Sequence, residues 1–319
     1  MKWIKKGQIF MPNGEFDWMN SYTTPIAAML LEDRIRVYFS TRSKLDVNGN
    51  FISYATFIDL DKRNPKEIIH INNKPLLELG SEGMFDEYGI MIAKPVIVDS
   101  TVYLYYMGWQ RLAGKAPYQV MLGLAKSFDM GMSFFKESKG PVLGIDTKDP
   151  ISIGNVCVLH EDGLWKMWYT SYIRWSFNGI KPTPEYNIKY AESRNGVDWN
   201  KTNIVCIEED EKGGIATPSV IKKDNIYHMW FGYRPDYSSD GKVAGYSIGY
   251  ARSIDGINWK RDDDNSGISV SNTGWDADMV CYPHVIECEG NYLMFYCGNG
   301  FGETGFGYAL LEGGELCNH

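Results

Sequence analysis

The sequence has no apolar run long enough to cross a membrane. None of its hydrophobic stretches approaches the roughly 18 residues of a transmembrane helix. The first ten residues, MKWIKKGQIF, lack the apolar core of a signal peptide. The six cysteines show no CxxC spacing, and they are too sparse for a small disulfide-rich domain. We therefore expect a cytoplasmic protein with reduced thiols and no membrane span.

Signatures of metal, nucleic-acid and dinucleotide binding are also missing. The five histidines are scattered, with no HExxH or similar spacing, so no metal site is expected. The net charge of −8 argues against a nucleic-acid partner, because binding a phosphate backbone requires clustered Lys and Arg. The glycine-rich segment from Asn299 to Gly305 joins two expected strands instead of opening a helix. We therefore expect no organic cofactor.

The chain is rich in aromatic and turn-forming residues. Aromatics make up 14% of the sequence, and there are 33 glycines, a composition typical of many short strands joined by tight turns. The 319 residues would suffice for two average domains or one large all-β domain. No linker composition divides them, so a single domain over residues 1–319 is expected.

One strand–turn–strand unit occurs three times. Its clearest copy is YSIGYARSIDGINWK, residues 246–260, and the others begin at Tyr186 and Tyr118. In the turn, Asp255 can bond its own backbone and Gly256 accepts positive φ. Residues 127–134 fit the Asp-box pattern SxDxGxSF. We interpret the turn aspartates as structural and not catalytic.

A strand ending in paired aromatics recurs five times along the chain. Its equivalent positions, separated by 67, 63, 62 and 65 residues, are Phe39, Tyr106, Tyr169, Phe231 and Tyr296. Four antiparallel strands repeated at this period predict the blades of a five-bladed β-propeller. The fifth repeat lacks its fourth strand, and Trp3 resembles the tryptophans that follow the turns. Residues 1–10 are therefore predicted to complete the last blade and close the ring, which removes an exposed sheet edge.

With these turns and aromatic strands, the chain resembles the five-bladed propeller superfamily of glycoside hydrolases. This is the clan of arabinanases, invertases and levansucrases, with the related mannoside phosphorylases. The resemblance implies carboxylates on the first strands of different blades, around a central pocket, and in several members an Asp immediately precedes the first-strand proline. The matching positions of this chain are Thr24, Lys94, Gly154, Thr217 and Tyr282. None is acidic, so the chain is identified as an atypical member.

Carboxylates do cluster slightly upstream of the first strands. Cleavage of a glycosidic bond uses one carboxyl group as acid and another as base or nucleophile. The preferred catalytic candidates are Asp86 and Asp278, which stand in mostly apolar runs where a pKa shift is plausible, with Glu87 and Asp149 in reserve. The alternative is that each of these residues is solvated or caps a turn.

Several cationic and aromatic residues are expected on the pocket face. Arg42 and Arg234 follow the aromatic strands of the first and fourth repeats, and an arginine fork can bind a carboxylate or phosphate. The alternative for each is a salt bridge between loops. The remaining candidates for substrate binding are Lys94, Trp109, Trp175, Tyr233, Tyr282 and His284.

The predicted function is that of a carbohydrate-active enzyme, glycosidase or glycoside phosphorylase, which cleaves or transfers a glycosyl group in an axial pocket. The expected partner is a small saccharide, a glycosyl phosphate or an activated sugar. The alternative is a non-catalytic glycan-binding or scaffold propeller of a surface-polysaccharide pathway, because the acids beside the prolines are missing.

Overall fold

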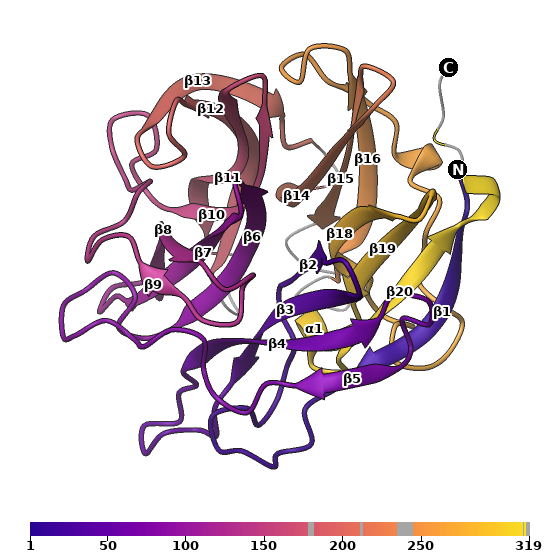
Figure 1. Ribbon diagram of the computed structural model, residues 1–319. Coiled ribbons are helices and arrows are strands. Elements are labelled where there is room, and N and C mark those ends of the chain that lie inside the picture. The colour runs from indigo at the N-terminus through magenta and orange to yellow at the C-terminus, as the bar shows by residue number, and fades with distance from the viewer. Residues whose placement is uncertain (178–181, 211–212, 235–244, 315, 317–319) are drawn as a thin grey trace.

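The computed structural model describes residues 1–177, 182–210, 213–234, 245–314 and 316. These residues form five antiparallel four-stranded sheets, the blades of a β-propeller (Figure 1). Blade 1 consists of β2 (Ile26–Leu30), β3 (Arg34–Arg42), β4 (Ser53–Asp61) and β5 (Ile68–Ile71). Blade 2 consists of β6 (Ile90–Val98), β7 (Thr101–Arg111), β8 (Tyr118–Ser127) and β9 (Phe135–Lys136). Blade 3 consists of β10 (Ile153–Glu161), β11 (Leu164–Ser176), β12 (Thr183–Ser193) and β13 (Trp199–Ile207).

Blades 4 and 5 complete the ring. Blade 4 consists of β14 (Gly214–Lys223), β15 (Ile226–Arg234), β16 (Ser247–Ser253) and β17 (Lys260–Arg261). Blade 5 consists of β18 (Cys281–Cys288), β19 (Asn291–Cys297), β20 (Phe306–Leu311) and β1 (Trp3–Phe10). The helical turns are η1 (Asp263–Asn265), α1 (Asn299–Gly302) and η2 (Glu312–Gly314). Within the described ranges, no helix is both long and apolar enough to span a bilayer.

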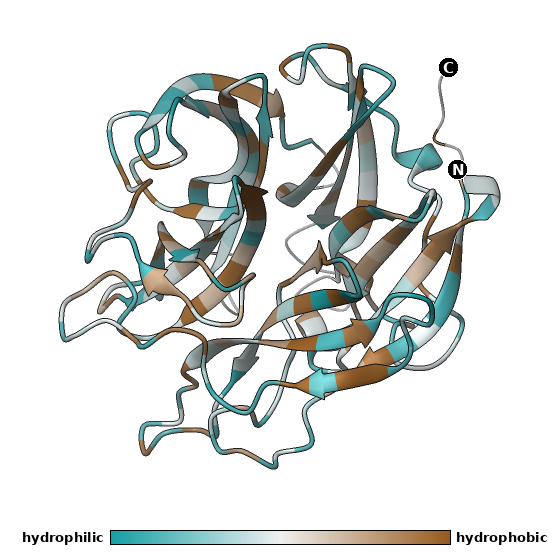
Figure 2. Cartoon of the chain, viewed as in Figure 1, coloured by the Kyte–Doolittle hydropathy of each residue, from teal (hydrophilic) through white to brown (hydrophobic). Residues whose placement is uncertain are grey.

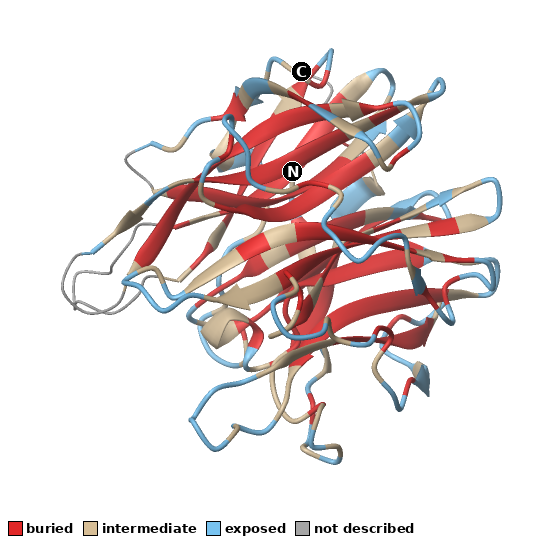
Figure 3. Ribbon diagram, turned by 90° about the vertical axis from the view of Figure 1, so that its left-hand side faces the viewer, coloured by how far each residue is buried: buried red, intermediate tan, exposed pale blue. Residues whose placement is uncertain are grey.

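The innermost strands surround the propeller axis. Strands β2, β6, β10, β14 and β18 contact one another in sequence, and β18 returns to β2, so the ring is closed (Figure 1). Apolar residues concentrate on the strands, and polar ones on the connecting turns (Figure 2). The strands are accordingly buried, while exposure is concentrated in the loops at their ends (Figure 3). The predicted five-bladed all-β architecture is confirmed.

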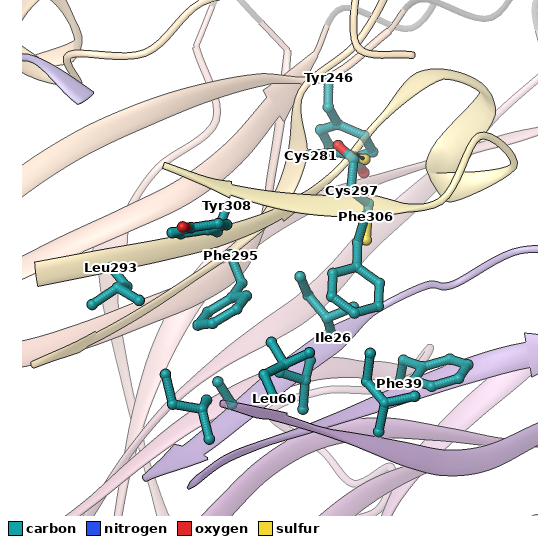
Figure 4. Packing of buried hydrophobic residues seen from close by; sticks show 14 of the residues in the cluster. Ile26, Phe39, Leu60, Tyr246, Cys281, Leu293, Phe295, Cys297, Phe306 and Tyr308 are labelled. Atoms are coloured by element: carbon teal, nitrogen blue, oxygen red, sulfur yellow. Dashed lines mark hydrogen bonds between the residues drawn. The ribbon is translucent and has the colours of Figure 1, made fainter. Parts of the chain in front are cut away.

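The N-terminal strand completes blade 5, as the sequence predicts. β1 pairs antiparallel with β20 from Trp3 opposite Leu311 to Phe10 opposite Phe306. Trp3 is buried, and its ring lies edge-on to Trp230 of blade 4 with the ring centroids 5.7 Å apart. The seam between blades 5 and 1 is filled by an apolar cluster that includes Phe295, Phe306 and Phe39 (Figure 4). The two ends of the chain are therefore joined by a sheet ladder and by packing.

In three blades, the first residue of the aromatic pair on the second strand is hydrogen-bonded to the next blade. Trp168 Nε1 in blade 3 donates a hydrogen bond to the carbonyl of Gly256 in the outer turn of blade 4, at 2.7 Å. The same link joins blade 2 to blade 3 through Tyr105 and Gly196 at 2.7 Å. It joins blade 1 to blade 2 through Tyr38 and Gly131 at 3.0 Å. The recurring turn is thus a contact between blades.

The turn geometry explains its composition. Asp255 Oδ1 accepts hydrogen bonds from the backbone N–H groups of Ile257 and Asn258, both at 2.8 Å. Burial would raise the pKa of Asp255, but hydrogen bonds from Asn258, Ile257 and Ser253 outweigh it and hold the pKa below its usual range. Gly256 has a φ of 77°, and a Cβ there would lie 3.0 Å from the Trp168 ring. These contacts support the structural role predicted for the turn aspartates.

Because Trp3 holds the closing strand in place, its loss is expected to destabilise the entire ring. Trp3→Ala should lower the free energy of unfolding by about 3–5 kcal/mol, the cost of truncating a buried tryptophan. Thermal unfolding followed by circular dichroism should show one cooperative transition at a lower temperature. The control is Met11→Ala, just beyond the same strand, where the side chain is 50% exposed. A separate early transition of one blade, with the remainder unchanged, would contradict the closure role.

Candidate active site

The innermost strands are irregular where they approach the axis. Their pairing with the second strand shifts register between Ile92 and Lys94, and equivalent shifts occur in blades 3, 4 and 5. Thr217 and Tyr282, which precede the prolines of β14 and β18, have φ values of 57° and 54°. Such bulges re-aim side chains relative to a regular strand, and left-handed backbone at bulky residues persists only where the surroundings enforce it. The positions that precede the prolines are therefore specialised in structure although they are not acidic.

Five tyrosines from four blades meet at the axis. This axial tyrosine cluster consists of Tyr118, Tyr172, Tyr186, Tyr246 and Tyr282. The rings of Tyr172 and Tyr186 are 4.9 Å apart, and those of Tyr246 and Tyr282 are 5.7 Å apart. Tyr118 of blade 2 interacts electrostatically with Tyr246 of blade 4. Because these two blades are not neighbours in the ring, their side chains can meet only across its centre.

Burial keeps the hydroxyls of four members of this cluster, Tyr118, Tyr172, Tyr186 and Tyr282, protonated. It raises the pKa of Tyr118 to about 12, in spite of a hydrogen bond to Tyr172 and the nearby arginines, which act in the opposite direction. It also raises the pKa values of Tyr172, Tyr186 and Tyr282 well above the usual value. A neutral phenol can donate a hydrogen bond as well as accept one. The cluster therefore presents O–H donors at neutral pH.

Arg234 is embedded in the tyrosine cluster. It ends β15, is only 5% exposed, and its guanidinium carbon lies 5.2 Å from the centroid of the Tyr246 ring. Burial would lower its pKa, but interactions with Tyr246 and Tyr186, including a hydrogen bond to each, outweigh this and raise it. Arg234 is thus a permanent cation at the centre of the propeller.

Arg42 approaches the same cluster from blade 1. It ends β3, and its guanidinium carbon lies 3.9 Å from the Tyr22 ring centroid and 5.3 Å from that of Phe51. Both Arg42 and Arg234 act to lower the pKa of Tyr118. Two arginines from blades 1 and 4 therefore influence one hydroxyl from blade 2.

Lys94 and His284 lie together on the inner strands. His284 is buried, and its Nε2 is 3.0 Å from the carbonyl oxygen of Ala28 in blade 1. Burial first, and then the nearby Lys94, hold the pKa of His284 well below its usual range, so the imidazole is neutral. Lys94 remains partly exposed. The axis therefore carries positive charge from Lys94 in addition to the two arginines.

The structure brings together most of the residues predicted to bind substrate. The Tyr118 ring lies 4.1 Å from Trp109 and 5.0 Å from Trp175, measured between ring centroids. Tyr233 is the exception among these contacts, because its ring faces Arg261 of the outermost strand of blade 4 at 5.3 Å. It points to the opposite side of the sheet from Arg234, as adjacent residues of a strand do.

The predicted acid Asp86 is buried inside blade 2. It is 1% exposed, accepts a hydrogen bond from the Tyr106 hydroxyl at 3.1 Å and forms an ion pair with Lys136 of β9 at 2.6 Å. Tyr106 is the second residue of its aromatic pair, and β9 is the outermost strand. Asp86 thus links the second and fourth strands of its own blade.

The same arrangement recurs in two further blades. Asp149 accepts a hydrogen bond from Tyr169 at 2.9 Å and pairs with Lys201 of β13 at 3.1 Å. In blade 5, Asp276 is bound by Tyr296 at 2.9 Å and by Lys5 of β1 at 2.6 Å. We call this unit the Asp–Tyr–Lys clip. Its repetition supports a structural role for Asp86 and Asp149, and the catalytic assignment of both stays a prediction.

The other two predicted acids are more accessible. Glu87 accepts hydrogen bonds from the Gly83 N–H at 2.8 Å and from Gln110 at 3.2 Å. The Gly83 bond in particular lowers the pKa of Glu87. Asp278 is exposed, and its backbone N–H is fixed by Asn299 Oδ1 at 2.7 Å. Their catalytic assignment also stays a prediction.

Sequence reasoning did not select most of the tyrosine cluster as functional. Tyr118, Tyr186 and Tyr246 each begin a copy of the repeated strand–turn–strand unit, so the signal was present as a shared position. Glu303 was also not selected. Its carboxylate lies beside the Tyr22 hydroxyl, whose pKa is raised mainly by burial and further by Glu303, against the influence of Arg42.

A separate groove of about 1060 Å³ lies between blades 1 and 2, away from this cluster. Its lining includes Tyr54, Lys74, Phe135, Lys136 and Lys139, and no member of the tyrosine cluster. Among the described residues, no group of three or more His, Cys, Asp or Glu side chains is arranged to hold a metal ion. The axial residues are therefore the site with convergent polar and aromatic groups from several blades.

Comparisons with known proteins give relatives at moderate and at low sequence identity. No family model matches the chain. The uncharacterized protein Rv1502 of Mycobacterium tuberculosis is 36% identical over 315 residues, which cover 98% of this chain and 100% of that protein. A 1,2-β-oligomannan phosphorylase of Thermoanaerobacter sp. is 24% identical over 154 residues, 46% of each chain.

Solved structures share the fold. One described with the GH130 family of mannoside phosphorylases, which contains glycoside hydrolases that target β-1,2 mannosidic linkages, aligns with a TM-score of 0.68. The alignment covers 99% of this chain and 95% of that chain at 13% identity. At this identity the similarity establishes the propeller fold alone.

The clip around Asp149 gives a prediction that separates structure from catalysis. Asp149→Asn should lower the free energy of unfolding by about 3–5 kcal/mol, because Lys189 and Lys201 lose their buried partner. Asp162→Asn, at an exposed position, is the control.

The stabilisation by Asp149 is also expected to depend on pH. Burial would raise the pKa of Asp149, but Ser171, Lys189 and Lys201 outweigh it and lower the pKa. The stabilisation is then complete above the unfolded-state pKa of about 4 and is lost as the pH falls below it. Urea unfolding between pH 7 and pH 3 should therefore show a smaller difference between wild type and Asp149→Asn at the acidic end. Equal stability at pH 7 would rule out the clip role.

Proposed function

We propose, from its fold and its site, that this chain is a carbohydrate-active enzyme; it belongs to the same protein family as the uncharacterized protein Rv1502 of Mycobacterium tuberculosis. It cleaves or transfers a glycosyl group at the axial tyrosine cluster. The propeller is shared with glycoside hydrolases and mannoside phosphorylases, and part of the chain is similar to an oligomannan phosphorylase. These similarities support a saccharide as substrate.

The convergence of aromatic and hydrogen-bonding groups at the axis is the observation that carries the proposal. Saccharides are bound by aromatic faces together with a few fixed polar groups, an arrangement typical of small-molecule sites. Here Trp109 and Trp175 flank Tyr118, and Arg234 stands among the tyrosines. Tyr118, Tyr282, Trp109 and Trp175 all keep part of their surface exposed, so a ligand can reach them.

For the chemical step, we propose carboxylates from the predicted set of Asp86, Glu87, Asp149 and Asp278. Glycoside cleavage requires a group that donates a proton to the leaving oxygen and a second group, or an external nucleophile such as phosphate, that attacks the anomeric carbon. Asp278 and Glu87 have the accessibility that a reacting group needs. Asp86 and Asp149 are engaged in ion pairs with lysines, which makes them the weaker candidates.

A non-catalytic glycan-binding propeller is the second candidate. It is favoured by the clips, which hold two of the four predicted acids, and by the absence of an acid before the first-strand prolines. In that case the axial cluster would bind a saccharide without cleaving it. The two candidates differ in turnover and share the binding site.

The test is turnover of a panel of aryl glycosides and β-1,2-linked oligomannosides, with and without inorganic phosphate. Asp278→Asn and Glu87→Gln are compared with the exposed control Asp162→Asn. Loss of a group that transfers a proton should lower kcat by about 100-fold or more, whereas the control should retain full activity. Release of a glycosyl phosphate only when phosphate is present would identify phosphorolysis. Saccharide binding without any turnover would favour the binding module.

A further inference from the structure

We propose that Glu303 is a further catalytic residue of the axial site, a general base that activates water, and that the Tyr22 hydroxyl positions its carboxylate. The inference rests on the proposed function and deepens it, because a base for water makes the reaction a hydrolysis and not a phosphorolysis. It follows from the contacts between the loop after β19 and the segment before β2.

Glu303 and Tyr22 come from opposite ends of the chain and meet at the seam between blades 5 and 1. Tyr22 precedes β2, and Glu303 directly follows α1. The Tyr22 hydroxyl donates a hydrogen bond to the Glu303 carboxylate. Phe301, two residues before Glu303, lies with its ring centroid 5.9 Å from that of Tyr246. The loop that carries Glu303 therefore adjoins the axial tyrosine cluster.

Arg42 connects Tyr22 with the same cluster. Its guanidinium carbon lies 3.9 Å from the Tyr22 ring centroid. Burial raises the pKa of both Tyr22 and Tyr118, and Arg42 opposes the rise in both cases. One guanidinium can act on both hydroxyls only if it lies near both. Since Trp109 is 4.1 Å from Tyr118 between ring centroids, the proposed base lies beside the surface proposed to bind the sugar.

The two segments that carry the pair are fixed to each other. The Thr23 N–H donates a hydrogen bond to the Gly302 carbonyl at 3.0 Å, and Cys297 Sγ donates one to the Thr23 carbonyl at 2.8 Å. A Cβ on Gly302 would lie 3.0 Å from that Thr23 carbonyl oxygen. Tyr22 has a φ of 64°, which a bulky residue keeps only where its surroundings enforce it. The position of the pair is thus set by the backbone, as a functional site requires.

The neighbours of Glu303 in the chain also restrict its side chain. A Cβ on Gly300 would lie 2.7 Å from Oε2 of Glu303, so the glycine leaves room for the carboxylate. Thr304 is held on two sides: its Oγ1 donates a hydrogen bond to the Trp275 carbonyl, and its own carbonyl accepts one from Gln8 Nε2, both at 2.6 Å. The carboxylate therefore projects from a loop that is fixed on either side of it.

Glu303 differs from the acids of the clips in its availability. Asp86 and Asp149 are buried and paired with lysines. Glu303 is exposed, and over the described ranges it forms no ion pair. An ionised carboxylate has about four lone-pair sites, so the Tyr22 hydrogen bond leaves others for a water molecule. The group can therefore take a proton from water and return it to the solvent.

In the proposed step, a water oxygen bonds to the anomeric carbon and its proton passes to Glu303. The bond between the anomeric carbon and the leaving oxygen breaks. The leaving oxygen takes a proton from the acid of the site, for which Asp278 and Glu87 are the proposed candidates. Glu303 then loses its proton to the solvent and the acid regains one. Phosphate is already an anion and attacks without a base, so a phosphorylase would not need this group.

The experiment uses a glycoside that the wild-type protein turns over. Glu303→Gln and Glu303→Ala should lower kcat by about 100-fold or more and change KM little. Azide is a nucleophile that needs no base, so it should restore turnover of an aryl glycoside by Glu303→Ala and give a glycosyl azide, detected by mass spectrometry. Glu287→Gln is the matched control. Glu287 is an exposed glutamate at the other end of β18 that also accepts a hydrogen bond from a tyrosine, Tyr292, at 3.4 Å.

A second pair of variants tests the positioning role of Tyr22. Tyr22→Phe should lower kcat about tenfold, the effect of losing one hydrogen bond to a charged group. It should also move the acidic limb of kcat/KM to higher pH, because the ionised carboxylate loses a donor that favours it. Tyr292→Phe is the matched control and should do neither. Thermal unfolding of each variant establishes that it is folded.

Three results would overturn the role of Glu303. They are a wild-type kcat in Glu303→Gln, a folded Glu303→Ala that azide does not restore, and a wild-type protein that needs phosphate for turnover. Each of them leaves the proposed enzyme intact, because the wild-type protein still acts on glycosides. An unchanged pH profile in folded Tyr22→Phe would overturn the positioning role. No turnover of any glycoside by the wild-type protein would overturn the proposed enzyme together with the inference.

Discussion

The pair of aromatic residues on the second strand of each blade is the constraint on which much of the fold depends. In three blades the first residue of the pair donates a hydrogen bond to a glycine carbonyl in the outer turn of the next blade. In three blades the second residue binds a buried aspartate that is also paired with a lysine of the outermost strand. The first side chain of the pair thus makes a contact between blades, and the second makes a contact within its own blade. Opposite faces of a strand make this division possible.

Ring closure uses the same devices with a strand from the other end of the chain. Lys5 of β1 pairs with the buried aspartate of blade 5, as Lys136 does in blade 2. The first aromatic residue of blade 4, Trp230, packs against Trp3, whereas the equivalent residues of blades 1 to 3 bond to a glycine carbonyl in the next blade. The N-terminal strand therefore supplies both the missing ladder and the missing cation of the clip. A closed ring with rigid inner strands can hold irregular backbone, such as that of Thr217 and Tyr282, close to the axis.

The fold could be predicted from the sequence because its information is local and repeated. A spacing of 62–67 residues and a turn with Asp and Gly at fixed positions give the blade, and the match of Trp3 to later tryptophans gives the closure. The site could be predicted only in part. The sequence placed Arg42, Lys94, Arg234 and Tyr282 at the axis, but Tyr118 looked like an ordinary core residue, because Tyr172 and Tyr246, which it meets at the axis, lie in other blades. Likewise, the apolar neighbours of Asp86 do not reveal Lys136, which is 50 residues away and binds it.

Electrostatics links these features to function. Each clip holds a lysine and a buried aspartate together in the outer part of a blade, so those carboxylates and cations balance one another. The axis differs, because burial keeps Tyr118, Tyr172, Tyr186 and Tyr282 neutral and Arg234 lies among them as a cation. The clips thus keep their charges in ion pairs within single blades, whereas Arg234 is placed among tyrosines that come from several blades.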